Sequence, residues 1–168
     1  MTSDTLRKIL VIIAAVALAD SVPQSGWSRQ EVVEQANCET YSRNKVPKYR
    51  VAKTIPLAVP GLDLYVSVAP PDFERDKLLT LSCTLGKLYA DKDMLFVWIF
   101  DNRHAARQFD AQGEGNDRRT NLSRRARYSF SRVQNHVLGQ SLDLWLDPVD
   151  HPRPIHIDLG PPPPRPSR

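Results

Sequence analysis

The pattern of apolar and polar positions between residues 62 and 100 predicts the centre of the fold. Apolar and polar side chains alternate over 62–68, which is the period of a half-buried strand. Leucines then recur at helical spacing over 78–88, so we expect a helix over 73–89. Residues 94–100 are an unbroken apolar run, typical of a strand buried on both faces. This strand, helix and strand predict a parallel crossover around one core.

Shorter patterns on either side predict further strands. Residues 48–57 alternate and end near a proline, so we expect a strand antiparallel to the one at 62–68. Alternation returns over 127–133 and 141–146, which predicts a hairpin. Residues 154–159 favour a short strand at the edge of the sheet.

Two short helices and a loop complete the predicted elements. The sequence Ser28-Arg29-Gln30-Glu31 fits a capping box, so we expect a helix from there to about Ala36. A second short helix over 103–109 should turn its two alanines and Phe109 inward. The polar, glycine-containing stretch 111–121 is typical of a flexible surface loop.

Together these elements predict a single small α+β domain over 48–160. Its mixed β-sheet should have about five strands, with one main helix packed on one face. Residues 20–47 should form an N-terminal lead-in that contains the first short helix. The proline-rich tail at 161–168 cannot continue a sheet, so we expect it to be disordered and extended in solvent.

Residues 1–19 resemble a secretory signal peptide. Arg7 and Lys8 precede the apolar run 9–19, which ends in the small-x-small sequence Ala17-Leu18-Ala19. These eleven apolar residues are too few to cross a hydrocarbon layer that needs about 20, although an uncleaved anchor is the alternative. We therefore expect cleavage before Asp20, export to the periplasm or the cell exterior, and no membrane span in the mature chain.

Export changes how the two cysteines are interpreted. In an oxidising compartment two cysteines of a small domain usually pair, so we expect a disulfide between Cys38 and Cys83. The alternative, a nucleophilic Cys83, needs a nearby base and an electropositive, partly exposed setting. Cys83 instead lies on a mostly apolar helix, which favours the disulfide.

Positive charge is concentrated in one segment of the chain. The formal net charge is +4, and residues 103–127 hold seven arginines against three acidic residues. Arginine binds phosphate and carboxylate in a two-pronged geometry, so an anionic envelope component or a protein partner could bind here. Nucleic acid is a poor fit, because few aromatic residues lie nearby for stacking, and an ordinary solvated loop is the alternative. The candidate binding residues are Arg118, Arg119, Arg124, Arg125 and Arg127.

The chain lacks the sequence templates of common catalytic sites. It has no Gly-x-Ser-x-Gly elbow, no phosphate-binding glycine loop and no His-Glu-x-x-His pair. Asp101 and His104 follow the buried strand, where open α/β sheets place ligands, and could form an acid/base pair. A second cluster has ligand types suited to a divalent metal but matches no metal template, so we expect no metal or cofactor. It comprises Asp147, Asp150, His151, His156 and Asp158.

Helix capping and turn formation are the alternatives for both polar groups. If residues 154–159 are extended, His156 and Asp158 should share one face of a strand. These observations favour a non-enzymatic exported protein that binds or assembles with another component of the cell envelope. The alternative is a small hydrolase or metal-dependent enzyme that uses Asp101 with His104, or the cluster from Asp147 to Asp158.

Overall fold

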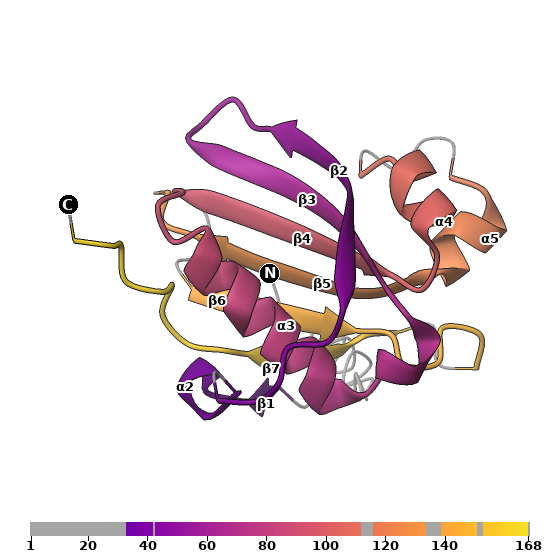
Figure 1. Ribbon diagram of the computed structural model, residues 1–168, viewed down its shortest axis with the longest axis horizontal. Coiled ribbons are helices and arrows are strands. Elements are labelled where there is room, and N and C mark those ends of the chain that lie inside the picture. Colours follow the sequence, from indigo (N-terminus) through magenta and orange to yellow (C-terminus); the bar gives the residue numbers. More distant parts are fainter. Residues whose placement is uncertain (1–32, 42, 112–115, 134–138, 151–152, 168) are drawn as a thin grey trace, which may run out of the picture. The chain divides into compact units, whose positions relative to one another are not determined.

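The residues that the computed structural model describes are 33–41, 43–111, 116–133, 139–150 and 153–167. The predicted signal peptide and the capping box lie outside them. The described residues form one mixed sheet in the strand order β1-β7-β6-β5-β4-β3-β2, with four α-helices (Figure 1). This confirms the α+β class, but the sheet has seven strands where about five were predicted. In the described part of the chain, no helix is long and apolar enough to cross a membrane.

The strands are β1 Glu34–Gln35, β2 Tyr49–Pro56, β3 Gly61–Val68, β4 Met94–Phe100, β5 Arg124–Ser131, β6 Gly139–Leu144 and β7 Ile155–Asp158. The α-helices are α2 Cys38–Tyr41, α3 Arg75–Leu88, α4 Arg103–Gln108 and α5 Arg118–Leu122, and a 3-10 turn, Pro70–Asp72, precedes α3.

The predicted crossover forms the middle of the sheet. β3 and β4 are parallel, with Leu64 opposite Val97, and α3 connects them. β4 coincides with the apolar run, and all of its residues except Phe96 are buried, because α3 packs on one face of the sheet and α4 on the other. β2 pairs antiparallel with β3, as predicted.

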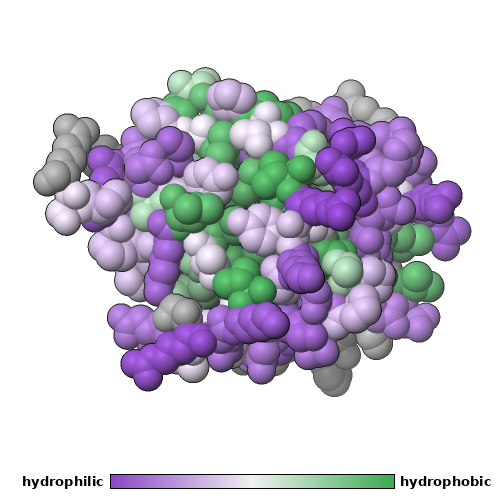
Figure 2. Space-filling view, in the orientation of Figure 1, coloured by the Kyte–Doolittle hydropathy of each residue, from purple (hydrophilic) through white to green (hydrophobic). Residues whose placement is uncertain are grey.

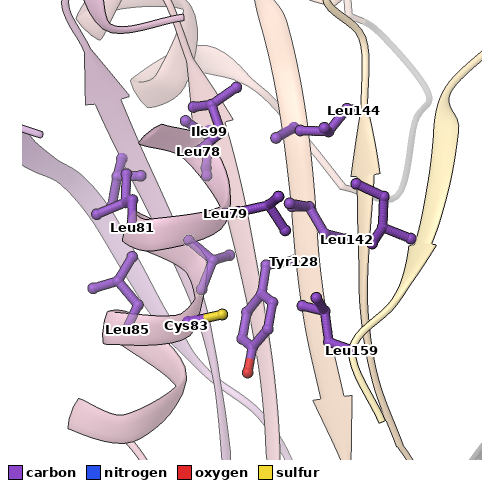
Figure 3. Packing of buried hydrophobic residues seen from close by; sticks show 14 of the residues in the cluster. Leu78, Leu79, Leu81, Cys83, Leu85, Ile99, Tyr128, Leu142, Leu144 and Leu159 are labelled. Atoms are coloured by element: carbon purple, nitrogen blue, oxygen red, sulfur yellow. The ribbon is translucent and has the colours of Figure 1, made fainter. Parts of the chain in front are cut away.

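α3 closes one face of the sheet, and four of its leucines are fully buried there: Leu78, Leu79, Leu81 and Leu85 (Figure 3). The helix packs closely against the sheet at Gly86. A Cβ atom at this position would lie 2.2 Å from Tyr128 Oη, so only glycine fits without a shift. Tyr128 is itself fixed, because its hydroxyl donates a hydrogen bond to Gln140 Oε1 at 2.8 Å. On the side of the molecule that carries α3, hydrophobic residues are interspersed with hydrophilic ones (Figure 2).

α4 covers part of the opposite face, over β2, β3 and β4. The ring centroid of Phe109, just after α4, lies 5.2 Å from those of Trp98 and Phe100. Asn102 caps α4, because its side chain accepts hydrogen bonds from the backbone N–H groups of His104 and Ala105, at 2.8 and 3.4 Å. The predicted inward direction of Phe109 and the two alanines of α4 is confirmed. Among the described residues, no helix covers this face over β6 and β7.

Two short predicted elements are wrong. Residues 34–35 form strand β1 and not the end of a helix, because their backbone pairs in parallel with β7 and Ala36 N donates to Asp158 O at 2.9 Å. β7 is therefore an inner strand and not an edge. The stretch expected to be a loop contains α5, which Asp117 begins by accepting a hydrogen bond from Thr120 N at 2.6 Å.

The predicted hairpin is confirmed, with different bounds. β5 and β6 are antiparallel, with Tyr128 opposite Leu142. β5 begins at Arg124, three residues before the first alternating stretch, and β6 begins at Gly139, two residues before the second. Each strand begins earlier than its alternating stretch because its first residue has a backbone partner: Arg124 pairs with Phe100 of β4, and Gly139 pairs with Ser131 of β5.

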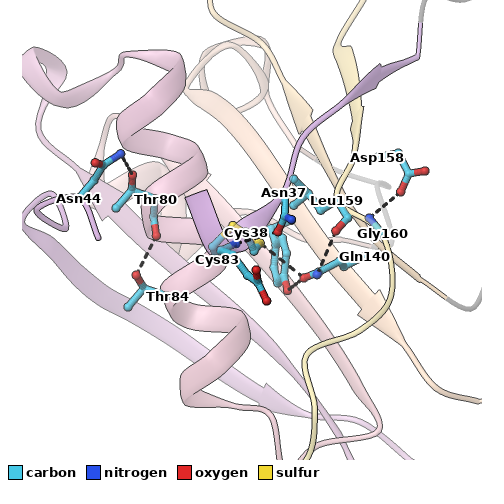
Figure 4. The surroundings of a disulfide bond; sticks show 12 residues. Asn37, Cys38, Asn44, Thr80, Cys83, Thr84, Gln140, Asp158, Leu159 and Gly160 are labelled. Atoms are coloured by element: carbon cyan, nitrogen blue, oxygen red, sulfur yellow. Dashed lines mark hydrogen bonds between the residues drawn. A yellow bond between two sulfur atoms is a disulfide. The ribbon is translucent and has the colours of Figure 1, made fainter. Parts of the chain in front are cut away.

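The expected disulfide joins Cys38 at the start of α2 to Cys83 in α3 (Figure 4). Their Cα atoms are 5.3 Å apart, and both residues are buried. Cys38 Sγ lies 3.8 Å from Gln140 Oε1, while Gln140 Nε2 donates to the carbonyl oxygen of Leu159 at 3.2 Å. The disulfide therefore fixes the segment before β2 to the helix that builds the core.

The proline-rich tail contacts the domain over part of its length. Pro161 O accepts a hydrogen bond from Gln140 Nε2 at 2.7 Å, and the carbonyl oxygen of the buried Pro163 accepts one from Arg132. Arg165 forms an ion pair with Asp93. The tail was expected to extend into solvent. Proline lacks an N–H group but keeps its carbonyl oxygen as an acceptor. The carbonyl oxygens of the tail therefore accept hydrogen bonds from side chains of the domain.

Candidate functional site

Three polar side chains line up across β5, β6 and β7 on the side of the sheet opposite α3. Arg127 lies directly opposite Asp143, and Asp143 lies opposite His156. Arg127 donates to Asp143 Oδ2 from Nε at 3.0 Å and from Nη2 at 2.6 Å. The other carboxylate oxygen of Asp143 lies 2.7 Å from His156 Nδ1. We call these three residues the polar row.

The carboxylate at the centre of the polar row is buried, whereas its two partners are not. The side chain of Asp143 is 7% exposed, that of Arg127 is 43% exposed and that of His156 is 41% exposed. Burying a carboxylate is costly unless it is paired and hydrogen-bonded, and here both of its oxygens have partners. Asp143 therefore holds an arginine and an imidazole in fixed orientations at the surface of the sheet.

A second set of polar side chains lies beside the polar row. Ser129 is opposite Ser141, and Ser141 is opposite Asp158. The two serine hydroxyls are 3.2 Å apart, and Asp158 Oδ1 accepts a hydrogen bond from Gly160 N at 2.8 Å. We call the polar row together with Ser129, Ser141 and Asp158 the open face.

A hollow of about 630 Å³ lies over part of the open face. Its lining includes both serines, His156 and Asp158, with Phe96 from β4. His156 and Asp158 both line this hollow, so they share one face of β7 as predicted. A hollow with an apolar wall and a few fixed polar groups is suited to binding a ligand.

Aromatic rings and a second arginine border the polar row. The guanidinium carbon of Arg124 lies 4.2 Å from the ring centroid of Trp145 and 5.9 Å from that of Trp98. Arg127 lies 5.7 Å from the same Trp98 ring. Burial, followed by the nearby charge of Arg127, lowers the pKa of Arg124. This border is cationic and aromatic, which suits an anionic group on a ligand.

The five arginines predicted to bind an anion do not form one patch. Arg127 belongs to the open face and Arg124 lies at its border, whereas Arg118 and Arg119 are exposed on α5. Arg125 binds Asp101 Oδ2 through Nε at 2.8 Å and Leu146 O through Nη1 at 3.2 Å. The binding role of these arginines remains a prediction, and only two of them contribute to the candidate site.

Asp101 and His104 do not form a pair in the structure. The carboxylate of Asp101 is occupied by Arg125, and His104 is exposed on α4. Asn102 caps that helix, although the sequence suggested Asp101 for this role. These contacts are structural and leave no acid/base pair at the end of β4.

The second predicted cluster is also divided. Asp147 stabilises a turn by accepting hydrogen bonds from the backbone N–H groups of Val149 and Asp150, at 3.2 and 3.1 Å. His151 lies outside the described residues, and His156 and Asp158 belong to the open face. Within the described ranges, no group of three or more His, Cys, Asp or Glu side chains is arranged to hold a metal ion.

Asp143, the central residue of the site, was missed by the sequence analysis. Its position in an alternating stretch identified only a polar face, and its partners are 16 and 13 residues away in the sequence. The register of two strand pairs was needed to bring the three together. Comparisons of the chain with protein-family models, curated proteins and solved structures found no match, so the site is interpreted from its own geometry.

Proposed function

We propose that this chain is a non-enzymatic binding domain of an exported compartment, and that its open face binds an anionic, hydroxyl-bearing component of the cell envelope. The polar row is the observation that carries the proposal. The Asp143 carboxylate is buried, which costs free energy because it loses its hydration. It orients Arg127 and His156, whose side chains are both more than a third exposed.

The arginines are the reason why we expect a negative charge on the ligand. Arg127 uses Nε and Nη2 to hold Asp143, and no described residue accepts a hydrogen bond from its Nη1. Nη1 can therefore donate to a carboxylate of the ligand, in the geometry that arginine favours. The guanidinium of Arg124, stacked on Trp145, adds positive charge at the same border.

The lining of the hollow is the reason why we expect hydroxyl groups on the ligand. Ser129 and Ser141 hydrogen-bond to each other, which uses one hydroxyl hydrogen and leaves the other to donate. Asp158 and His156 can accept from ligand hydroxyls, and Phe96 supplies an apolar surface. Carboxylates, hydroxyls and amides occur together in cell-wall glycans with peptide substituents, so such a polymer would match the lining.

The disulfide supports the exported compartment, because disulfides persist in oxidising surroundings and are rare in the cytosol. The segment at 1–19, which resembles a signal peptide, points the same way. The expectation can be checked by sequencing the N-terminus of protein recovered from outside the cytosol, where a start at Asp20 is predicted.

Co-sedimentation with peptidoglycan sacculi tests the binding function. The double variant Arg127→Gln/Asp143→Asn removes one charge of each sign, so the net charge of the protein is unchanged. We expect it to bind about tenfold more weakly, because charge-assisted hydrogen bonds and the orientation of the row are lost. The control Asp72→Asn/Lys77→Gln neutralises an ion pair at the start of α3 and should bind like the wild type. Equal binding by both variants would contradict the proposal.

One observation favours hydrolysis as a second candidate function. A buried aspartate that binds one nitrogen of a histidine leaves the other nitrogen available as a general base. Ser129 and Ser141 line the same hollow as His156, yet they hydrogen-bond to each other and not to the imidazole. Release of p-nitrophenol from p-nitrophenyl acetate that disappears in a His156→Gln variant would establish this function in place of simple binding.

A further inference from the structure

We propose that a hollow at the carboxyl ends of β3 and β4 binds a phosphoryl group. The hollow has a volume of about 820 Å³, and its lining includes Lys48, Arg50, Ser67, Val68, Asp101 and Arg103. None of these residues belongs to the open face, so this site is separate from the one in the proposed function.

The lining of the hollow is positively charged. Lys48, Arg50 and Arg103 contribute three cations, against the single carboxylate of Asp101. That carboxylate already binds Arg125, whose Nε lies 2.8 Å from Asp101 Oδ2. Arg125 therefore holds this carboxylate from outside the lining, and within the lining the three cations outnumber the single acid.

Among the described residues, the three cations have no carboxylate partners of their own. In the described part of the chain, every ion pair of an arginine or lysine is made by other residues, and none involves Lys48, Arg50 or Arg103. Three like charges around one hollow repel one another, and a bound anion relieves this repulsion. The two guanidinium groups also provide the forked donors that match tetrahedral oxyanions.

The position of the hollow follows from the topology of the sheet. β3 and β4 form the parallel pair, and both end at this edge with the backbone turning away after Val68 and Phe100. Ligands of open α/β sheets bind at the carboxyl ends of parallel strands, because the connections diverge there and leave room. Ser67, opposite Arg50 in the register, places a hydroxyl in the wall of the hollow.

The charge balance selects a phosphoryl group over a carboxylate. The lining carries three positive charges and one negative charge, a net of +2. A phosphate monoester carries about −1.5 to −2 at neutral pH and three acceptor oxygens, which matches both the charge and the number of cations. A single carboxylate would neutralise half of this charge.

Titration with inorganic phosphate at constant ionic strength, followed by the backbone amide NMR signals, tests the site. We expect saturable shifts at Arg50, Ser67 and Arg103. The variant Arg50→Gln/Arg103→Gln should bind phosphate at least about tenfold more weakly, because each lost charge-assisted contact is worth about that factor. Both residues are exposed and lack ion pairs among the described residues, so the variant should fold normally, which its circular dichroism spectrum will show.

The matched control is Arg118→Gln/Arg119→Gln, which removes the same two charges from α5. It should bind phosphate within about twofold of the wild type, as should the open-face variant Arg127→Gln/Asp143→Asn, since neither alters the hollow. Equal weakening in Arg50→Gln/Arg103→Gln and in Arg118→Gln/Arg119→Gln would show a general charge effect and overturn the proposal, as would the absence of saturable shifts. Loss of binding in the open-face variant alone would also overturn it.

Vesicles containing phosphatidylglycerol identify the source of the phosphoryl group. Binding that requires Arg50 and Arg103 would assign the site to a lipid headgroup, while saturable phosphate binding without vesicle binding would assign it to a soluble phosphorylated ligand. Each result supports the site. Vesicle binding that survives Arg50→Gln/Arg103→Gln, together with unshifted amides in the phosphate titration, would refute it.

Discussion

Gly86 lies at a close contact between the central helix and the sheet. Replacing it with alanine would place Cβ 2.2 Å from Tyr128 Oη and 2.9 Å from its ring carbon Cζ. Tyr128 cannot move easily, because it is fully buried and hydrogen-bonded to Gln140. We expect Gly86→Ala to lower the free energy of unfolding by about 1–3 kcal/mol, the usual cost of overpacking a core. Urea denaturation measures it.

The double variant Gly86→Ala/Tyr128→Phe is the control for this contact. It removes the hydroxyl oxygen that Cβ would meet first, so part of the stability lost in Gly86→Ala should return relative to Tyr128→Phe alone. Additive effects of the two substitutions would show that the helix and the tyrosine do not meet as described.

Tyr65 gives the fold a dependence on alkaline pH. Burial, with smaller contributions from the Asp63 and Asp110 carboxylates, raises the pKa of Tyr65 to about 12. An unfolded tyrosine has a pKa of about 10. As the pH rises from about 10 to 12, the unfolded phenol loses its proton while the folded one keeps it, so the contribution of Tyr65 to stability falls.

Urea denaturation of the wild type and of Tyr65→Phe across this range measures the effect. The loss of stability with rising pH should be smaller in Tyr65→Phe, and an ultraviolet titration of the wild type should show a late-ionising tyrosine that the variant lacks. Parallel pH profiles would contradict the assignment.

At the scale of elements, α4 depends on its cap. The side chain of Asn102 satisfies two backbone N–H groups at the start of a helix that holds Phe109 against Trp98. We expect Asn102→Ala to cost about 1 kcal/mol, the usual value for an N-cap, and to speed amide exchange in α4. Asn102→Asp keeps an acceptor in place and should cost much less. A cost for Asn102→Asp equal to that for alanine would argue against capping.

The elements with long, regular patterns could be predicted from the sequence. The alternation in β3, the leucines of α3 and the apolar run of β4 each reflect burial, which fixes the pattern of side chains. β1 and α5 could not be predicted in this way. β1 is two residues long and exists because β7 offers a parallel backbone partner, and α5 is a single capped turn of helix. β1 therefore depends on a contact with a residue distant in the sequence, and α5 depends on its cap, Asp117.

At the scale of the whole molecule, the disulfide connects two parts of the chain that are 45 residues apart. The chain-entropy estimate for a loop of this length is about 4 kcal/mol, which is an upper value in practice. We expect Cys38→Ala/Cys83→Ala to lower the free energy of unfolding by roughly 2–4 kcal/mol. The wild type treated with a reducing agent is the control and should lose a similar amount. Unchanged stability after reduction would contradict a closed disulfide.

The candidate site could be predicted only in part. Arg127, His156 and Asp158 were all recognised as polar residues of interest, but in separate groups and for different reasons. Asp143 joins two of them, and its role depends on the pairing of β5, β6 and β7. Conversely, Asp101 and His104 are close in sequence but are not joined in the structure, because Arg125 occupies the carboxylate. Sequence spacing identified the residue types, and strand register decided which of them meet.

Binding of an envelope component to the open face can be located on the chain by an NMR titration of the protein with a soluble muropeptide. We expect saturable amide shifts at Ser129, Ser141, Asp143 and His156, with Thr80 and Thr84 on α3 unchanged. Shifts confined to Arg118 and Arg119 on α5, or to the α3 side of the sheet, would contradict it.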